Sequence, residues 1–243
     1  MTSWFISDLH LSPARPDITR LFLEFLQEQA VHADALYILG DLFDAWIGDD
    51  DTSDFAAALQ GALRQVTQQG VPVYFIAGNR DFLVGPRFAR MTGVRLLNEP
   101  AVIDLYGTPT LLLHGDSLCT ADRSYQRFRR IIRQPWLVKI LLALPLSMRM
   151  RIANKLRASS ATQQPLSAEQ LAIMDVTDTA VIDLFVRYDV GQMIHGHTHR
   201  PAIHEHQLPD GNTAERIVLG DWYEQGSLLR VTRTERQLIS QPL

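Results

Sequence analysis

Five short apolar runs in the chain each end at a polar residue that can bind a metal ion. Runs of this length, rich in Ile, Val, Leu, Tyr and Phe, are typical of buried strands. They are WFIS, ALYILG, VYFIAG, TLLL and GQMI, and they lead into Asp8, Asp41, Asn79, His114 and His195. Helical patterns over 18–31 and 54–69 separate the first three runs. This alternation predicts an α/β sheet whose strand ends, with their polar residues, gather at one edge.

The middle of the chain breaks this alternation. Residues 122–157 follow a helical pattern in which apolar residues and arginines are intermixed, with interruptions at Pro135 and Pro145. The small, polar stretch ASSATQQPLS predicts a loop after it. We therefore expect an inserted helical lobe at 122–165, placed over a core made of residues 1–121 and 166–243.

The last third of the chain returns to the core. A helical pattern from about Leu166 to Tyr188 leads back to the sheet. After His199 the short runs PAIHEH, AERIVLG and GSLLRVT alternate as strands do and predict a closing antiparallel region.

Composition limits the class of protein. The 243 residues are 46% hydrophobic, which suits one α/β domain with an inserted lobe. The net charge of -4 gives no general reason to expect nucleic-acid binding, and we predict neither a nucleic-acid nor a protein partner. A single cysteine, Cys119, excludes an internal disulfide framework and a thiolate zinc cluster, as is typical of a reducing compartment. The N-terminal MTSWFISDLH lacks the pattern of a signal peptide, and the apolar run WLVKILLALPL is about half of a spanning helix.

The strand ends and their neighbours supply seven oxygen and nitrogen donors. Side chains two apart in an extended segment lie on the same side, so the D-x-H and H-x-H pairs can each grip one ion. Seven mixed donors exceed the needs of one tetrahedral ion and suit two divalent ions that share a carboxylate. The seven candidates are Asp8, His10, Asp41, Asn79, His114, His195 and His197.

These motifs, in this order, resemble the calcineurin-like metallophosphoesterase superfamily. They are D-L-H at 8–10, G-D at 40–41, G-N-R-D at 78–81, H-G-D at 114–116 and G-H-T-H at 196–199. The stretches ALYILGDLFDAWIGDD, FIAGNRDFLVG, LLLHGDSLCTAD and IHGHTHRPA more closely resemble the UDP-2,3-diacylglucosamine pyrophosphatase family of lipid A biosynthesis. The resemblance implies the sandwich of that superfamily, two β-sheets flanked by helices, in the α/β class.

The resemblance also implies a pair of divalent ions, with Mn²⁺ as the ion associated with the family. One ion would be held by Asp8, His10, Asp41 and His197, and the other by Asp41, Asn79, His114 and His195, with Asp41 bridging. Two such ions bind phosphoryl oxygens and lower the pKa of a water between them. That water would attack the α-phosphorus of UDP-2,3-diacylglucosamine and give UMP and 2,3-diacylglucosamine 1-phosphate.

Arg80 stands where many metallophosphoesterases carry a histidine that protonates the leaving group. An alcohol has a pKa near ~16, whereas the second pKa of a phosphate monoester is ~6, so a phosphate leaves far more easily. A pyrophosphate bond can therefore break without a general acid, and we expect Arg80 to hold phosphate charge through its planar fork of donors. The alternative is a structural role in which Arg80 pairs with Asp81 or caps a helix.

The lobe is strongly basic. From Arg123 to Arg157 the net charge is +10, against -14 for the remainder of the chain. These arginines alternate with apolar residues, a mixture typical of surfaces that meet anionic lipid. We expect the lobe to bind acyl chains and an anionic membrane, as a peripheral protein on the cytoplasmic side of the bacterial inner membrane. A solvated amphipathic helical pair remains the alternative.

Further substrate contacts are implied by the resemblance, with one departure. They are Asn79, Arg80, Asp122, Ser160 and His195. Family members carry a basic residue near position 167, whereas this chain has ATQQPLSAEQ, so Gln164 and Ser167 occupy that stretch without a charge. We expect Arg157 or another lobe arginine to compensate.

Two other functions stay open at this stage. A soluble dimetal phosphodiesterase or phosphatase would use the same donors on another phosphorylated substrate, and a binding scaffold would keep the fold without catalysis. Among the remaining polar residues, His199 is expected outside the ligand set, His204 and His206 at alternating strand positions, and Asp49 to Asp51 in a solvated loop or helix start.

Overall fold

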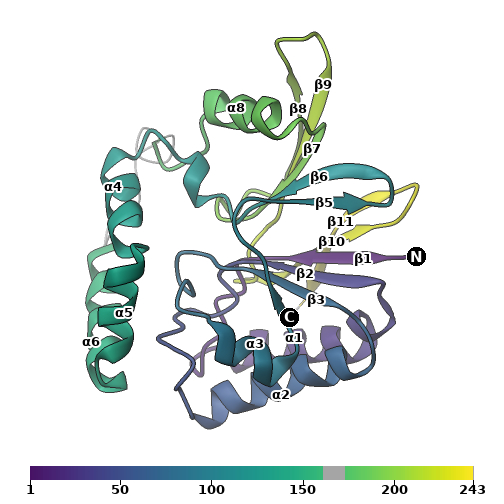
Figure 1. The fold of residues 1–243 in the computed structure, drawn as a ribbon. Coiled ribbons are helices and arrows are strands. Elements are labelled where there is room, and N and C mark those ends of the chain that lie inside the picture. Colours follow the sequence, from purple (N-terminus) through teal and green to yellow (C-terminus); the bar gives the residue numbers. More distant parts are fainter. Residues whose placement is uncertain (161–172, 243) are drawn as a thin grey trace.

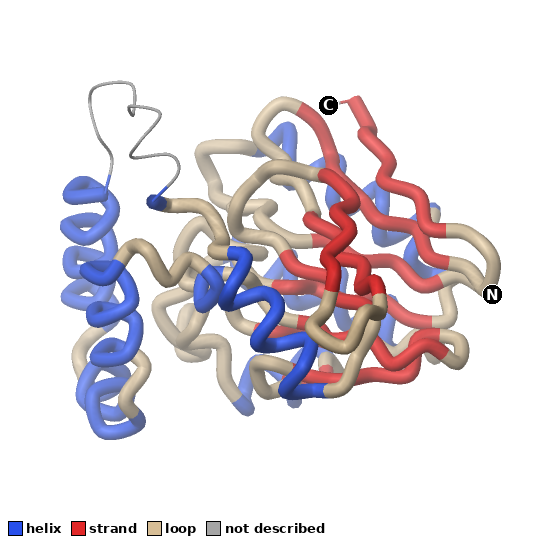
Figure 2. The backbone as a smooth tube through the Cα atoms, turned by 90° about the horizontal axis from the view of Figure 1, so that it is seen from above, coloured by secondary structure: helices blue, strands red, loops and turns tan. Residues whose placement is uncertain are grey.

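The computed structural model describes residues 1–160 and 173–242, and the side chains of residues 157–160 lie outside the description. Two β-sheets pack face to face with helices on both outer faces (Figure 1). This confirms the predicted α/β sandwich. Three helices of the inserted segment stand apart from the sandwich, beside the edge at which the first strands end (Figures 1 and 2).

The first sheet has six strands in the order β11-β10-β1-β2-β3-β4. Strands β1 to β4 run parallel, and β10 pairs antiparallel with both β1 and β11. The strand bounds are Ser3–Ile6 (β1), Ala35–Leu39 (β2), Val73–Ile76 (β3), Arg95–Leu96 (β4), Gln225–Val231 (β10) and Arg236–Pro242 (β11). Its outer face is covered by α1 (Pro16–Glu28), α2 (Asp54–Gln68) and α3 (Pro86–Thr92), with a short 3-10 turn at Ala30–His32.

The second sheet has five strands in the order β5-β6-β7-β9-β8. The bounds are Ala101–Leu105 (β5), Thr108–Leu112 (β6), Gln192–His195 (β7), Ala202–Gln207 (β8) and Thr213–Val218 (β9). Helix α8 (Asp178–Tyr188) covers its outer face, and a 3-10 turn (Asp116–Leu118) follows β6. The inserted segment forms α4 (Arg123–Ile132), α5 (Pro135–Ala143) and α6 (Leu146–Ser160).

Three apolar clusters build the layers. The first lies between the six-stranded sheet and α1 to α3 and contains Phe22, Phe25 and Trp222. The second lies between the sheets, where Phe5 and Ile194 are fully buried, and the third lies under α8. Strands buried on both faces need apolar residues throughout, which explains why WFIS and ALYILG read as continuous apolar runs.

Two predictions about the chain after residue 165 need correction. The described part of 166–188 is not one helix, because the chain turns at Met174–Thr177 and α8 begins at Asp178. Asp175 accepts a hydrogen bond from the Val176 amide, a local bond that competes with a continuous helix. The closing strands also do not form one antiparallel region: β8 and β9 complete the second sheet, whereas β10 and β11 complete the first.

The inserted lobe stays a prediction as a separate unit, since 161–165 lie outside the described residues. Among residues 123–156, Arg149 is the one buried side chain, at 3% exposure. Its guanidinium donates to the carbonyls of Ile47 (2.6 Å) and Leu144 (2.9 Å) and pairs with Asp50. At the other end of the lobe, Arg129 of α4 and Arg133, the residue that caps the C-terminus of α4, reach carboxylates of the core.

The prediction of a solvated loop holds for Asp50, whose side chain is 47% exposed although it also pairs with Arg149, but it is wrong for Asp49. Asp50 anchors Arg149. Asp49 accepts hydrogen bonds from the amides of Gly85 (3.0 Å) and Phe88 (2.9 Å) at the start of α3 and from the Trp46 indole (3.0 Å).

The described residues contain no helix that is both long and apolar enough to cross a membrane.

Candidate metal-binding active site

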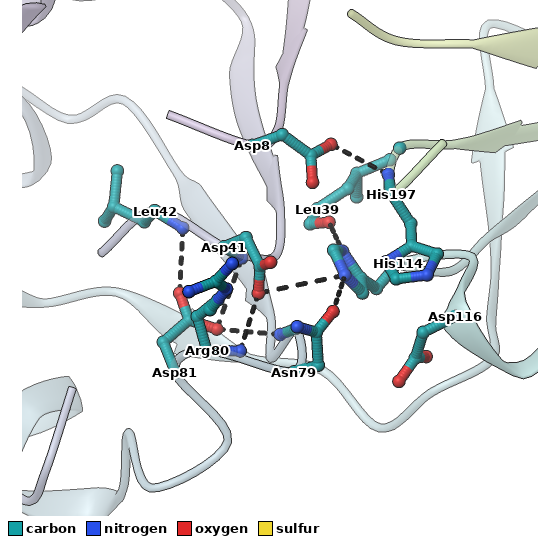
Figure 3. A network of polar contacts seen from close by, with 12 residues as sticks. Asp8, Leu39, Asp41, Leu42, Asn79, Arg80, Asp81, His114, Asp116 and His197 are labelled. Atoms are coloured by element: carbon teal, nitrogen blue, oxygen red, sulfur yellow. Dashed lines mark hydrogen bonds and ion pairs between the residues drawn. The ribbon is translucent and has the colours of Figure 1, made fainter. Parts of the chain in front are cut away.

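The polar residues predicted at the strand ends lie together at the edge of the sandwich nearest the lobe. Asp8, Asp41, Asn79, His114 and His197 surround one small volume in Figure 3. Asp8, Asp41, His114 and His195 are each no more than 2% exposed, and His10 is 5% exposed. The ring of His114 lies 5.0 Å from that of His197, centroid to centroid.

The backbone that presents these side chains is strained. Asp8, His10, Asp41, His197 and His199 all have positive φ, between 50° and 70°. Non-glycine residues adopt this left-handed region rarely, and such strain gathers at functional sites. The explanation given above for the D-x-H pair is therefore wrong in its geometry. Strand β1 ends at Ile6, and left-handed turns rather than an extended strand direct both side chains inward.

Glycine allows the closest approach in the site. A Cβ atom on Gly78 would lie 2.2 Å from Asp41 Oδ1 and 2.5 Å from the Asp41 amide nitrogen. The loop after β3 could then not rest against the end of β2. The motif G-N at 78–79 is thus required for packing as well as for the Asn79 side chain.

Hydrogen bonds fix the buried side chains. His114 Nε2 lies 3.0 Å from Asn79 Oδ1, and its Nδ1 lies 2.9 Å from the Leu39 carbonyl. The amide of Arg80 donates to Asp41 Oδ1 (2.8 Å), and the amide of His197 donates to Asp8 Oδ2 (2.8 Å). These bonds link the ends of five strands, β1, β2, β3, β6 and β7, that lie far apart in the sequence (Figure 3).

Asp81, next to Arg80, holds the loops after β2 and β3 together through hydrogen bonds. Its carboxylate accepts from the amides of Gly78 (2.8 Å), Leu42 (2.8 Å) and Asp41 (3.3 Å). The alternative role for Arg80, a pair with Asp81, is therefore not the one observed. Arg80 instead lies 3.5 Å from Asp44, and its side chain is 31% exposed.

Several buried ligand atoms have no hydrogen-bond partner. They are both ring nitrogens of His10 and Asp8 Oδ1, which makes no hydrogen bond but lies 3.4 Å from His199 Nε2. Ligand atoms within 4.8 Å of one another define two groups, Asp8–His10–His199 and Asp8–Asp41–His114. Buried polar atoms without partners are costly, and carboxylate, imidazole and amide donors without sulfur suit hard or intermediate divalent ions. The residues present therefore fit a divalent metal.

The electrostatics of several of these buried groups favour the binding of a cation. Burial, together with Asp81 and Asp8, raises the pKa of Asp41 to about 7 against the opposing effect of His114. Burial lowers the pKa of His10 and His195 to about 3 and that of His197 to about 4. Neutral imidazole is the form that binds a metal, and a divalent ion would relieve the repulsion among the carboxylates.

His195 and His197 are near the cluster but outside its two ligand groups among the described residues. Both nitrogens of His195 have protein partners: Nδ1 lies 2.8 Å from the Gly196 carbonyl and Nε2 lies 3.2 Å from Arg216. Of the substrate-contact candidates, Asp122 caps α4 by accepting from the Tyr125 amide at 2.9 Å. The side chains of Arg157 and Ser160, and the whole of Gln164 and Ser167, lie outside the described residues.

The sequence interpretation missed part of the site. His199 Nε2 lies 3.4 Å from Asp8 Oδ1, and its Nδ1 lies 2.9 Å from Asp221. These carboxylates outweigh the effect of burial and raise the pKa of His199 to about 10. A signal for Asp221 existed, because RIVLGD at 216–221 repeats the pattern of YILGD at 37–41, an apolar strand followed by Gly-Asp.

A second missed cluster joins the lobe to the site. Asp116, fully buried, accepts from Tyr125 Oη (2.8 Å) and from Arg129 Nε (2.7 Å). Arg133 donates to the carbonyl of Gly78 at 2.9 Å, one residue before Asn79. The C-terminal end of α4 is thus bonded, through its capping residue, to the loop that carries Asn79 and Arg80.

Comparison with known proteins places the chain in a family. The family model for calcineurin-like phosphoesterases matches residues 1–201. A protein of Vibrio cholerae serotype O1 called UDP-2,3-diacylglucosamine hydrolase is 53% identical over 244 residues, covering 100% of this chain and 98% of its own. A protein of Yersinia pestis with the same name is 53% identical over 242 residues, covering 100% of both chains.

Solved structures are more distant. An archaeal phosphodiesterase has a TM-score of 0.48 at 12% identity, covering 99% of both chains. The metallophosphoesterase match and the buried donor cluster together indicate a divalent metal site. On the family model and the full-length relatives, this chain belongs to the calcineurin-like phosphoesterase family.

Proposed function

We propose that this protein hydrolyses the pyrophosphate bond of UDP-2,3-diacylglucosamine and releases UMP and 2,3-diacylglucosamine 1-phosphate. The observation that carries the proposal is the buried cluster at the strand ends, where Asp8 Oδ1 and both ring nitrogens of His10 make no hydrogen bond, with Arg80 beside it. Two relatives that bear the name UDP-2,3-diacylglucosamine hydrolase and match the chain over its full length support the choice of substrate.

The cluster is proposed to hold two divalent ions, with Mn²⁺ as the ion used. Asp8, His10, Asp41 and His197 would hold one, and Asp41, Asn79, His114 and His195 the other. Such ions, when bound, supply Lewis acidity toward phosphoryl oxygens and make a water nucleophilic near neutral pH. The chain would contribute the seven donor residues to this site, together with the strained turns that present them.

Arg80 is proposed to bind the phosphate oxygens of the substrate. Its amide is fixed on Asp41, so the side chain starts from a rigid point at the edge of the cluster. The guanidinium is partly exposed and can turn from Asp44 toward a phosphate, on which its fork of donors places two parallel hydrogen bonds. It stabilises negative charge that develops on the departing phosphate, a leaving group that needs no proton.

The lobe is proposed to receive the acyl chains and to contact an anionic membrane at the cytoplasmic side of the inner membrane. Support comes from large apolar side chains that α4 and α5 leave exposed beside arginines. Ile131 is 51% exposed, Trp136 60% and Ile140 52%. Each methylene buried by an acyl chain contributes ~0.8 kcal/mol, so such a surface stabilises a diacyl substrate strongly. Asp122, Arg157, Ser160, Gln164 and Ser167 remain proposed substrate contacts on this side.

The test compares two substrates in the presence and absence of metal. Metal-stripped protein is assayed on UDP-2,3-diacylglucosamine and on deacylated UDP-glucosamine, before and after addition of Mn²⁺. The proposal predicts turnover after Mn²⁺ addition and a strong preference for the diacylated substrate. Equal turnover of both substrates would indicate a soluble phosphodiesterase instead, and metal-independent turnover would overturn the mechanism.

A further inference from the structure

An exposed aromatic ring lies at the edge of the metal-binding cluster, in the loop between β9 and β10. Tyr223 is 43% exposed. One face of its ring stacks on His10, with 5.3 Å between centroids and an angle of 8° between the planes. The ring of His199 lies 5.8 Å away at an angle of 58°. Tyr223 therefore covers one candidate metal ligand while much of its own surface stays open to solvent.

The backbone around Tyr223 is held on both sides. Arg15, which is itself paired with Asp17, donates to the Tyr223 carbonyl at 2.8 Å. The preceding Trp222 is fully buried, and its amide donates to the Asp8 carbonyl at 3.2 Å. A ring on a fixed backbone loses little conformational freedom when a ligand packs against it. Such a rigid, exposed aromatic ring can serve as a binding platform.

A second tyrosine borders the cluster from the lobe. Tyr125 of α4 stacks on His197, with 6.1 Å between centroids and 24° between the planes. In contrast to Tyr223, Tyr125 is partly buried, and its hydroxyl is bonded to Asp116. The cluster is thus bordered by Tyr125 on the side of the lobe and by Tyr223 on the side of the core.

The two sides differ in chemistry. The lobe side offers exposed apolar residues such as Trp136 and Ile140. The core side is polar, since Arg80, Asp44 and Asp221 are charged groups that interact with Tyr223. A substrate with a lipid half and a nucleotide half, joined by the pyrophosphate at the cluster, would place its lipid half toward the lobe. The nucleotide half would then lie toward Tyr223.

We infer that Tyr223 is the stacking platform for the uracil base of the substrate and of the product UMP. The inference rests on the proposed function and adds a nucleotide subsite to it. Every base has a π-face that can stack on an aromatic ring, and loss of one such contact weakens binding by about fivefold or more.

The test separates the base from the phosphate. UMP and ribose 5-phosphate are titrated calorimetrically into protein loaded with Mg²⁺, for the wild type, Tyr223→Phe and Tyr223→Leu. The ratio of the two dissociation constants isolates the contribution of the base. We expect UMP to bind more tightly than ribose 5-phosphate in the wild type and in Tyr223→Phe, which keeps the ring. In Tyr223→Leu the ratio should fall by about fivefold or more, with the affinity for ribose 5-phosphate unchanged.

A spectroscopic measurement on the wild type does not depend on the folding of a variant. Stacking on an aromatic ring should shift the uracil H5 and H6 resonances of UMP upfield on binding to the Mg²⁺-loaded protein. An equal ratio in all three proteins, or unshifted uracil resonances, would overturn the inference. Hydrolysis of UDP-2,3-diacylglucosamine by the wild type is assayed separately. Turnover with an unchanged ratio means that only the Tyr223 subsite is wrong, whereas absent turnover means that the proposed function is wrong.

Discussion

Replacement of Arg149 by Met should release the far end of the lobe from the core. Arg149 is buried at the start of α6 and makes four hydrogen bonds, two to carbonyls and two to the Asp50 carboxylate. Hydrogen bonds of charged groups contribute ~1.5–3 kcal/mol each in protected surroundings. The Asp50 side chain is 47% exposed, so solvent screens its pair with Arg149. We therefore expect a net loss of about 2 kcal/mol, roughly 30-fold in the opening equilibrium.

Amide hydrogen exchange measures this opening locally. Peptides from α6 and from residues 46–51 should exchange roughly 30-fold faster in Arg149→Met. Peptides from β1 to β3 should be unchanged, because the apolar clusters of the sandwich do not depend on this contact. Arg151→Met is the matched control, since Arg151 is an exposed arginine of the same helix. Equal exchange in the two variants would refute the role of Arg149 as the anchor.

Four further outcomes follow from the same structure. The hydrogen bond to Arg149 lowers the pKa of Asp50. The anchor is therefore fully formed above the ordinary Asp pKa of ~3.9 and weakens as the pH falls below that value. The difference in exchange rate between wild type and Arg149→Met should shrink from pH 5 to pH 3. Arg80→His should lower kcat/KM on UDP-2,3-diacylglucosamine by roughly 100-fold, and Arg80→Lys should lower it by a smaller factor. Equal kinetics of the wild type and both variants would place Arg80 away from the substrate. Gly78→Ala should abolish calorimetric Mn²⁺ binding, because the added methyl collides with Asp41; unchanged affinity would show that the loop can shift. Removal of metal by a chelator should lower Tm, and Mn²⁺ should restore it, whereas a metal-insensitive Tm would argue against binding to the folded state.

The sequence was sufficient to locate the chemistry because strand ends meet at one edge of a sheet. Asp8, Asp41, Asn79 and His114 each follow a parallel or central strand, and the structure brings them together as expected. Helices α1 and α2 lie where the apolar spacing predicted them. Local patterns determine these features, and tertiary packing does not alter them.

Features that depend on tertiary contacts were not predictable in the same way. The positive φ of Asp8 and His197 arises from hydrogen bonds between distant strand ends, such as that from the His197 amide to Asp8. The partners of Asp50 and Asp116 are arginines of the lobe, about 100 and 13–17 residues away along the chain. No periodicity in the acidic run indicates which distant cation it meets, so a solvated loop was the natural expectation.

The position of bond cleavage can be read from isotope incorporation during hydrolysis. UDP-2,3-diacylglucosamine is turned over by the Mn²⁺-loaded protein in water enriched in ¹⁸O, and both products are analysed by mass spectrometry. Attack of water at the α-phosphorus predicts that UMP carries the label and that 2,3-diacylglucosamine 1-phosphate does not. Label in the sugar phosphate would contradict the proposed reaction at this site.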